Sequence, residues 1–322
     1  MVTGRKTQGK TAIFTHILLR FRRAIIGASL CFFSIGAIAE PATTEKPSGP
    51  AIWRLADDDT EIFLFGTVHV LPPDLRWQTD HMIEAFQSSD IIYFETSHLD
   101  QDAVGYFEFF RAGQAPPGEG VLDVLSDEQK RILSEVLEQL GLTLDSLKGQ
   151  RPWYAALILG FQALEQQGQV AEYGVETWLE GKIRDDQTVR SLEGGLEVPD
   201  ALSAMSMEAQ IAMLMDGLEE VVSDEADILT DLDQTFEYSL KVWQKGRPEK
   251  LFDSDMEDMR TTTPEIYAAM FTDRNRKWTT QLHEVMTTET GRIFVAVGAA
   301  HLTGPESVVH MLEAEGWTVE RY

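Results

Sequence analysis

Two histidines of this chain follow the same local pattern, and a pair of histidines at one site can bind a metal ion. Gly66-Thr-Val-His69 and Gly298-Ala-Ala-His301 each come directly after a short, mostly apolar stretch, and they lie about 230 residues apart. One such unit alone is most simply a structural turn, because glycine lets the backbone turn closely. Open α/β sheets, however, bind ligands at the carboxyl ends of their strands. The repetition therefore predicts that His69 and His301 meet at one site.

Carboxylates lie at the ends of other predicted strands and helices, and they could serve as metal ligands or as a general base. Glu95 and Glu193 each end a short strand-like stretch, and Glu176 lies at the start of a predicted helix. Two imidazoles with carboxylates suit Mn, Co or Zn. The sequence therefore predicts a divalent metal with His69, His301, Glu95 and Glu176 as candidate ligands. A carboxylate that does not bind the metal could instead deprotonate a metal-bound water, so Glu95 and Glu193 are also catalytic candidates.

Arg274 is a further candidate, because its planar guanidinium could bind a developing oxyanion or a substrate carboxylate. Several other catalytic motifs, in contrast, are absent from this sequence. There is no Gly-x-Ser-x-Gly nucleophile elbow and no glycine-rich phosphate loop. The His-Glu-x-x-His motif of zinc proteases would need a histidine at position 287, where Thr287 stands. His98, three residues after Glu95, could reach the same cleft.

The first 39 residues are typical of a secretory signal. They contain six basic and no acidic residues, and the apolar stretch 24–39 ends in Ala37-Ile-Ala39. This order predicts cleavage before Glu40 and an exported protein, periplasmic or secreted. An uncleaved anchor is an alternative, although a membrane span needs about 20 apolar residues. Lipidation at Cys31 is a third, disfavoured by the large Leu30 that precedes it.

The charge of the chain excludes some partners. The full sequence has 27 basic and 53 acidic residues, a net charge of −26. Loss of the leader leaves about 21 basic residues and a charge of about −32. Such a chain is not expected to bind nucleic acid or to insert stably in a membrane after cleavage. The leader also contains the one cysteine, so the mature chain has no disulfide and no thiolate site. Its oligomeric state is not predicted.

The remaining chain predicts an α/β fold. After a Pro/Thr/Ser-rich linker at 40–50, a hairpin covers 51–65, and a β-α-β unit leads to Glu95. Right-handed crossovers return parallel strands in register, so His69 and Glu95 should share one sheet edge. The final strand leads to His301. We expect a mixed, largely parallel central sheet built from both chain ends, with a mainly helical insertion at about 100–290, in one domain at 51–322.

Three helices of the insertion are clearly indicated. Ser126 with Gln129 three residues later forms a capping box. The segment Trp153–Gln167 is apolar on most faces and is expected to be central. Thr263-Pro264 begins a helix that is expected to run to about Thr288 and that contains Arg274 and Asn275.

Taken together, these residues resemble the TraB/GumN family, which includes the Tiki proteases. The resemblance extends from about Ala51 to Tyr322. Its motifs are Gly66-Thr-Val-His69, Glu95, Gly174-Val-Glu176, Leu192-Glu193, Arg274-Asn275 and Val297-Gly-Ala-Ala-His-Leu-Thr-Gly304.

The resemblance implies a function as well as a fold. The Tiki branch consists of metal-dependent proteases that favour Mn or Co. His69, Glu95 and His301 would then be the metal or catalytic set, with Arg274 and Asn275 close by. The prediction is a metal-dependent hydrolase, foremost a peptidase with a peptide or protein substrate. A hydrolase of another bond, such as an ester, and a non-enzymatic protein that sequesters a peptide or signal in the same cleft are the alternatives.

Overall fold

The computed structural model describes residues 49–97, 99, 104–216, 218, 228–251 and 256–322. The predicted leader, nearly all of the linker and His98 lie outside these residues. Within them, no helix is both long enough and apolar enough to span a membrane.

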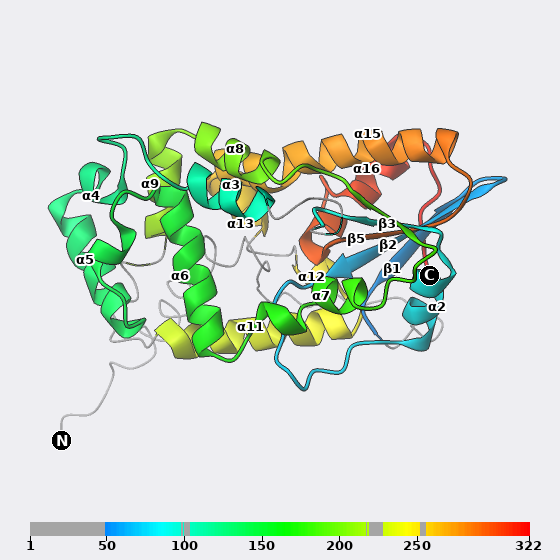
Figure 1. Ribbon diagram of the computed structural model, residues 1–322, viewed down its shortest axis with the longest axis horizontal. Coiled ribbons are helices and arrows are strands. Elements are labelled where there is room, and N and C mark those ends of the chain that lie inside the picture. The colour runs from blue at the N-terminus through cyan, green and yellow to red at the C-terminus, as the bar shows by residue number, and fades with distance from the viewer. Residues whose placement is uncertain (1–48, 98, 100–103, 217, 219–227, 252–255) are drawn as a thin grey trace, which may run out of the picture.

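The described residues form a six-stranded sheet in the order β4-β3-β5-β2-β1-β6, which lies at one end of the molecule (Figure 1). β4, β3, β5 and β2 are mutually parallel, whereas β1 and β6 add antiparallel pairs at one edge. The expected α/β class with a mixed, largely parallel sheet is confirmed. The strands are β1 (Ile52–Ala56), β2 (Thr60–Thr67), β3 (Ile91–Phe94), β4 (Thr188–Ser191), β5 (Gly291–Gly298) and β6 (Glu320–Arg321).

β2 and β5 are the central pair, and they come from opposite ends of the chain. Their registered partners include Gly66 with Val297 and Thr67 with Gly298, so the two Gly-x-x-His units are offset by one residue. A side chain at Gly66 would place its Cβ only 3.0 Å from the Cα of Ala299. Glycine at position 66 therefore lets the backbones of the two units lie in close contact, and a larger residue would need Ala299 to shift by a few tenths of an ångström.

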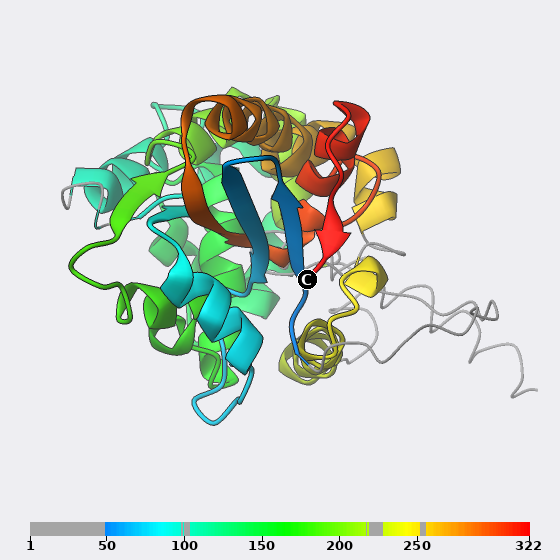
Figure 2. The same ribbon diagram turned by 90° about the vertical axis from the view of Figure 1, so that its right-hand side faces the viewer.

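Helices cover both faces of the sheet, which is why its central strands are apolar over residues 62–65 and 293–297. On one face, α15 (Asp273–Thr288) and α16 (Val308–Ala314) pack on the side chains of Leu64 and Val295 (Figure 2). On the other face, α2 (Asp80–Ser88) contributes Phe86, whose ring lies 5.4 Å from that of Phe294.

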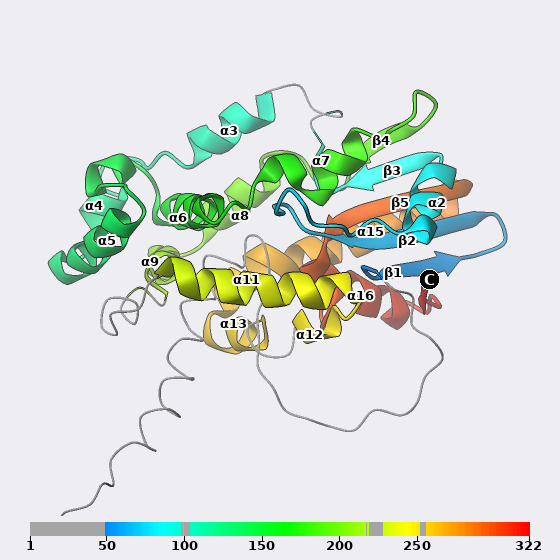
Figure 3. The ribbon, with the colours of Figure 1, turned by 90° about the horizontal axis from the view of Figure 1, so that it is seen from below.

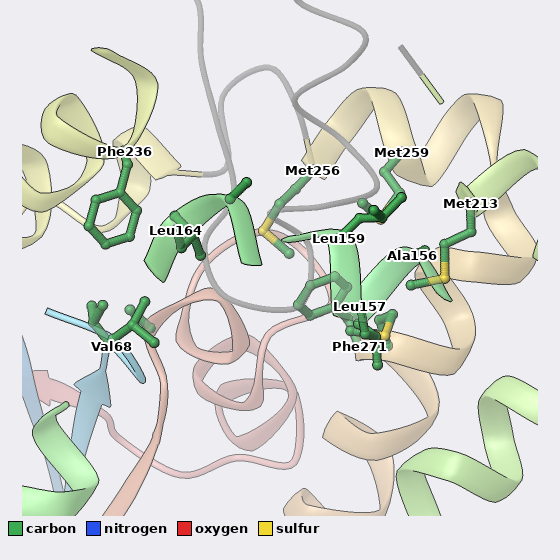
Figure 4. Close-up of a cluster of buried hydrophobic side chains, with 14 of the residues drawn as sticks. Val68, Ala156, Leu157, Leu159, Leu164, Met213, Phe236, Met256, Met259 and Phe271 are labelled. Carbon is green, nitrogen blue, oxygen red and sulfur yellow. The ribbon is translucent and has the colours of Figure 1, made fainter. Parts of the chain in front are cut away.

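The insertion is mainly helical, and its helices are α3 (Val104–Ala112), α4 (Val121–Val124), α5 (Asp127–Gln139), α6 (Pro152–Gln166), α7 (Val175–Glu180), α8 (Glu197–Ala204), α9 (Met207–Met215), α11 (Ile228–Gln244), α12 (Glu249–Leu251), α13 (Glu257–Thr262) and α14 (Pro264–Tyr267). Helices α3 to α6, α8, α9 and α13 form the other end of the molecule, whereas α7 lies beside β3 and β4 (Figure 3). Ser126 and Gln129 form the expected capping box at α5. α6 is the predicted central helix, and its Leu157, Leu159 and Leu164 pack in the cluster of Figure 4.

The expected helix from Thr263 to about Thr288 is confirmed over residues 264–288, but its α-helical geometry is interrupted by a π-turn. α14 is followed by a π-helix, Ala268–Thr272, before α15 begins. A π-turn inserts one extra residue per turn, a change that apolar periodicity does not reveal, and such turns are frequent at functional sites. The main-chain carbonyl of Met270 in this segment accepts a bond from Nη1 of Arg274 at 3.1 Å. The interruption thus directly precedes the two polar residues of interest.

Leu157 is the residue through which the role of α6 can be tested. It is only 5% exposed, so Leu157→Asp should bury an unpaired charge and destabilise the protein by about 3 kcal/mol or more. We expect the melting temperature to fall by roughly 10 °C in differential scanning calorimetry. Phe161→Asp, at a position of the same helix that is 46% exposed, is the matched control and should change it little. Equal melting temperatures for both variants would contradict the burial of α6.

Candidate functional site

Four parallel strands deliver one polar residue each to the same edge of the sheet. β2 leads to His69, β5 to His301, β3 to Glu95 and β4 to Glu193. Gly298 marks the point where three of them converge. A methyl group added there would lie 3.2 Å from Oε1 of Glu95. It would also lie 3.5 Å from Cδ2 of His301 and 3.8 Å from Nε2 of His69.

Arg274, in the first turn of α15, is the hub of the site. Its Nη2 donates to Oε2 of Glu95 and to Oε1 of Glu193, both at 2.6 Å. Its Nε donates to Oε2 of Glu193 at 3.0 Å. Nη1 lies 3.1 Å from Nε2 of His301, and the guanidinium stacks on the ring of Trp278 at 4.6 Å. One buried cation therefore joins two carboxylates and an imidazole.

The orientation of His301 is set by Asn275. The amide Nδ2 of Asn275 donates to the main-chain oxygen of Glu306 at 2.8 Å, which directs Oδ1 toward the histidine. Oδ1 lies 2.6 Å from Nδ1 of His301, and an amide oxygen can only accept. Nδ1 therefore carries the proton, and Nε2 presents its lone pair to the site. The ring is also packed against those of Trp278 and Phe271.

The orientation of His69 is set in the same way by Glu176. Nδ1 of His69 lies 2.8 Å from Oε1 of Glu176, and the Thr67 hydroxyl donates to that same oxygen. The start of α7 lies against this segment, because a Cβ at Gly174 would be 2.1 Å from the carbonyl oxygen of His69. Because Glu176 binds Nδ1, the ring of His69 is oriented with Nε2 toward Gly298.

The two histidines have pKa values displaced in opposite directions. The charge of Glu176, which outweighs burial, raises the pKa of His69 to about 9. Burial, with the charge of Arg274, lowers the pKa of His301 to about 3. Burial would raise the pKa of Glu95, but Arg274 and both histidines hold it well below its usual range. Burial raises the pKa of Glu193, although Arg274 opposes the shift.

The pair His69–Glu176 predicts a pH-dependent stability of the metal-free protein. Since the folded pKa of about 9 lies above the unfolded 6.5, the stabilisation is complete below pH 6.5 and is lost as the pH rises through 9. We expect the melting temperature of the unaltered protein, measured in the presence of chelator, to fall more steeply between pH 7 and 10 than that of the Glu176→Gln variant. His283→Gln, which alters a half-exposed histidine paired with Glu315, is the control and should follow the unaltered protein. Parallel curves for the unaltered protein and Glu176→Gln would contradict the pairing.

The donors fit a divalent metal in type and in orientation. Both imidazoles have Nδ1 bound to an acceptor and Nε2 directed to the vicinity of Glu95, which is the usual support of metal-binding histidines. Nε2 of His301 and Oε1 of Glu95 are 3.8 Å apart. In the part of the chain that the structure describes, no group of three or more His, Cys, Asp or Glu side chains has the geometry to hold a metal ion. Arg274 contacts both Glu95 and His301 instead.

All seven site residues expected from the sequence lie in this network: His69, Glu95, Glu176, Glu193, Arg274, Asn275 and His301. The structure adds contacts that sequence reasoning missed. The main-chain N–H of Gly298 donates to Oε1 of Glu95 at 2.6 Å, and Thr67, Phe271 and Trp278 complete the surroundings. Thr67 lies inside the Gly66-Thr-Val-His69 motif, so its proximity could have been inferred, whereas the aromatic residues looked like ordinary core.

Comparison with known proteins places the chain among its relatives. The chain is 23% identical over 267 residues to the uncharacterized protein YbaP of Escherichia coli (strain K12), an alignment that covers 82% of this chain and 92% of YbaP. The YbaP protein of Shigella flexneri gives the same identity and coverage. No solved structure matches. The family profile of TraB/PrgY/gumN matches residues 51–321 of the 322 residues, and the protein therefore belongs to the TraB/PrgY/gumN family.

Proposed function

We propose that this protein is a metal-dependent hydrolase that cleaves peptide bonds after its export to the periplasm or the medium. One observation carries the proposal. Two imidazoles from adjacent strands have Nδ1 fixed by Glu176 and Asn275, and both Nε2 atoms are directed toward the vicinity of the carboxylate of Glu95. A site that served only to stabilise the fold would not need two separately oriented imidazoles beside a carboxylate.

Six of the seven site residues have a role in this proposal. His69, His301 and Glu95 would bind the ion, which is Mn, Co or Zn by donor type. Such an ion supplies Lewis acidity and lowers the pKa of water at the site. Glu176 and Asn275 bind Nδ1 of the two imidazoles, so that Nε2 of each faces the proposed metal position. Once an ion was bound by Glu95 and His301, the donors of Arg274 that now contact these two residues would be available to negative charge that develops on a carbonyl oxygen.

Peptide bonds are the substrate class that the resemblance to the Tiki branch implies. The high negative charge of the chain favours substrates that are neutral or basic over acidic ones. A second candidate function is the binding of a peptide without turnover. It is supported by the contacts that Arg274 already makes with Glu95, Glu193 and His301, so that two of the groups proposed as metal ligands have partners without an ion.

Metal content and peptidase activity separate these functions. The purified protein would be analysed by elemental mass spectrometry, stripped with chelator, and reloaded with Mn, Co or Zn. Each form would then be incubated with a peptide library. We expect cleavage products that disappear on stripping and return with one of the metals. Tight binding of intact peptides that does not depend on metal would overturn the hydrolase and favour the binding protein.

A further inference from the structure

Glu193 is the residue of the site that the proposed chemistry leaves without a role. Its side chain is only 1% exposed, and it accepts from both Nε and Nη2 of Arg274. Burying a second carboxylate beside Glu95 carries a large desolvation cost. A single carboxylate would already neutralise Arg274, so the structure contains one more negative group than the metal-free site requires.

Arg274 contacts two of the groups that a metal ion would need. Nη2 donates a hydrogen bond to Oε2 of Glu95, and Nη1 lies 3.1 Å from Nε2 of His301. A divalent cation and a guanidinium repel each other, and they would compete for the same carboxylate and the same lone pair. If Glu95 were the only partner of Arg274, metal binding would leave that arginine buried and unpaired, which is strongly destabilising.

We propose that Glu193 is a positioning residue that retains Arg274 when a metal ion takes over Glu95 and His301. This inference rests on the metal-dependent function proposed above. In the metal-free protein, Arg274 bridges both carboxylates and occupies the donors. If Glu95 and His301 held an ion, Arg274 would lose these two contacts and would remain paired with Glu193.

The contacts around Arg274 fit a short displacement of this kind. Glu193 is bound through Nε and Nη2, whereas His301 is reached only through Nη1. The carbonyl of Met270, in the π-helix, also accepts from Nη1, and Trp278 covers one face of the guanidinium. These fixed contacts allow Arg274 to lose Glu95 and still be paired, hydrogen-bonded and stacked.

Metal affinity measured by calorimetry tests this account, because the two residues should act with opposite signs. Mn²⁺ would be titrated into the full chain after chelator treatment. We expect Arg274→Met to tighten Mn²⁺ binding by about tenfold or more, since the competitor is gone. Glu193→Gln should weaken it by about tenfold, within the range that outer partners of metal ligands produce, because Arg274 then depends on Glu95.

A double variant and a surface control complete the test. In Arg274→Met/Glu193→Gln the buried charge of Glu193 is removed together with its partner, and Glu95 keeps the bond from the main-chain N–H of Gly298. This variant should bind Mn²⁺ as tightly as Arg274→Met, since Glu193 acts only through Arg274. Arg276→Met removes a charge from an exposed position of the same helix and should leave the affinity unchanged. If the unaltered protein binds Mn²⁺ but both single variants weaken binding, Arg274 and Glu193 are merely structural and the inference is wrong. An unaltered protein that binds none of Mn, Co and Zn contradicts the metal-dependent function itself.

Discussion

Replacing either His69 or His301 by alanine should remove nearly all of the bound metal, and not half of it. The reason is that both Nε2 atoms are directed toward the space beside Gly298 and the same Glu95 carboxylate, so one ion would depend on both. Loss of a direct ligand should cost more than the roughly 10- to 100-fold in affinity that outer partners contribute. Elemental mass spectrometry of each variant, beside its peptidase rate, measures both effects.

His310→Ala is the matched control for these histidine variants. His310 has a side chain 60% exposed on α16, so its loss should alter neither metal content nor rate. Full metal content and full activity in both His69→Ala and His301→Ala would contradict the proposed metal site. The two Gly-x-x-His units would then be turns that serve the fold alone.

Glu95→Gln should lower metal occupancy and activity together, because we expect Glu95 to bind the ion directly. Two histidines require a third protein ligand in a typical catalytic site, and Oε1 of Glu95 lies nearest to the point where the imidazoles converge. The alternative role, a general base, predicts a different result. Metal would then stay bound while the turnover rate falls by about 10²- to 10⁴-fold.

The same pair of measurements distinguishes the two roles of Glu95. Metal content is measured beside the single-turnover rate at saturating metal. Saturation ensures that a low rate reflects a slow chemical step and not incomplete metal occupancy. Glu61→Gln is the control, since Glu61 pairs with Arg292 at the opposite end of the central strands. A variant with full occupancy and an unchanged rate would exclude Glu95 from both roles.

Most of the sheet could be predicted from the sequence because its signals are local. The apolar stretches that become β2 and β5 are continuous, as buried parallel strands require, and glycine ends each one. Since the carboxyl ends of parallel strands share an edge, the placement of His69, His301 and Glu95 followed once the strands were assigned. The central position of α6 followed from a sequence that is apolar on most of its faces.

Which atoms contact one another was decided by tertiary structure. Glu176 was a candidate ligand in the sequence, but the contact of Gly174 with the main chain of His69 places it on Nδ1 of that histidine. The π-helix before α15 was not foreseen, because it adds a residue to a turn without altering the apolar pattern.

The sequence by itself thus determined the family, the class of fold and the residue types of the site. Only the tertiary structure decided that Arg274 joins Glu95, Glu193 and His301, groups that are distant along the chain. The physical reason is the range of the interactions. Strand and turn preferences act over a few residues, whereas a buried ion pair exists only after four strands and a helix have excluded water from it.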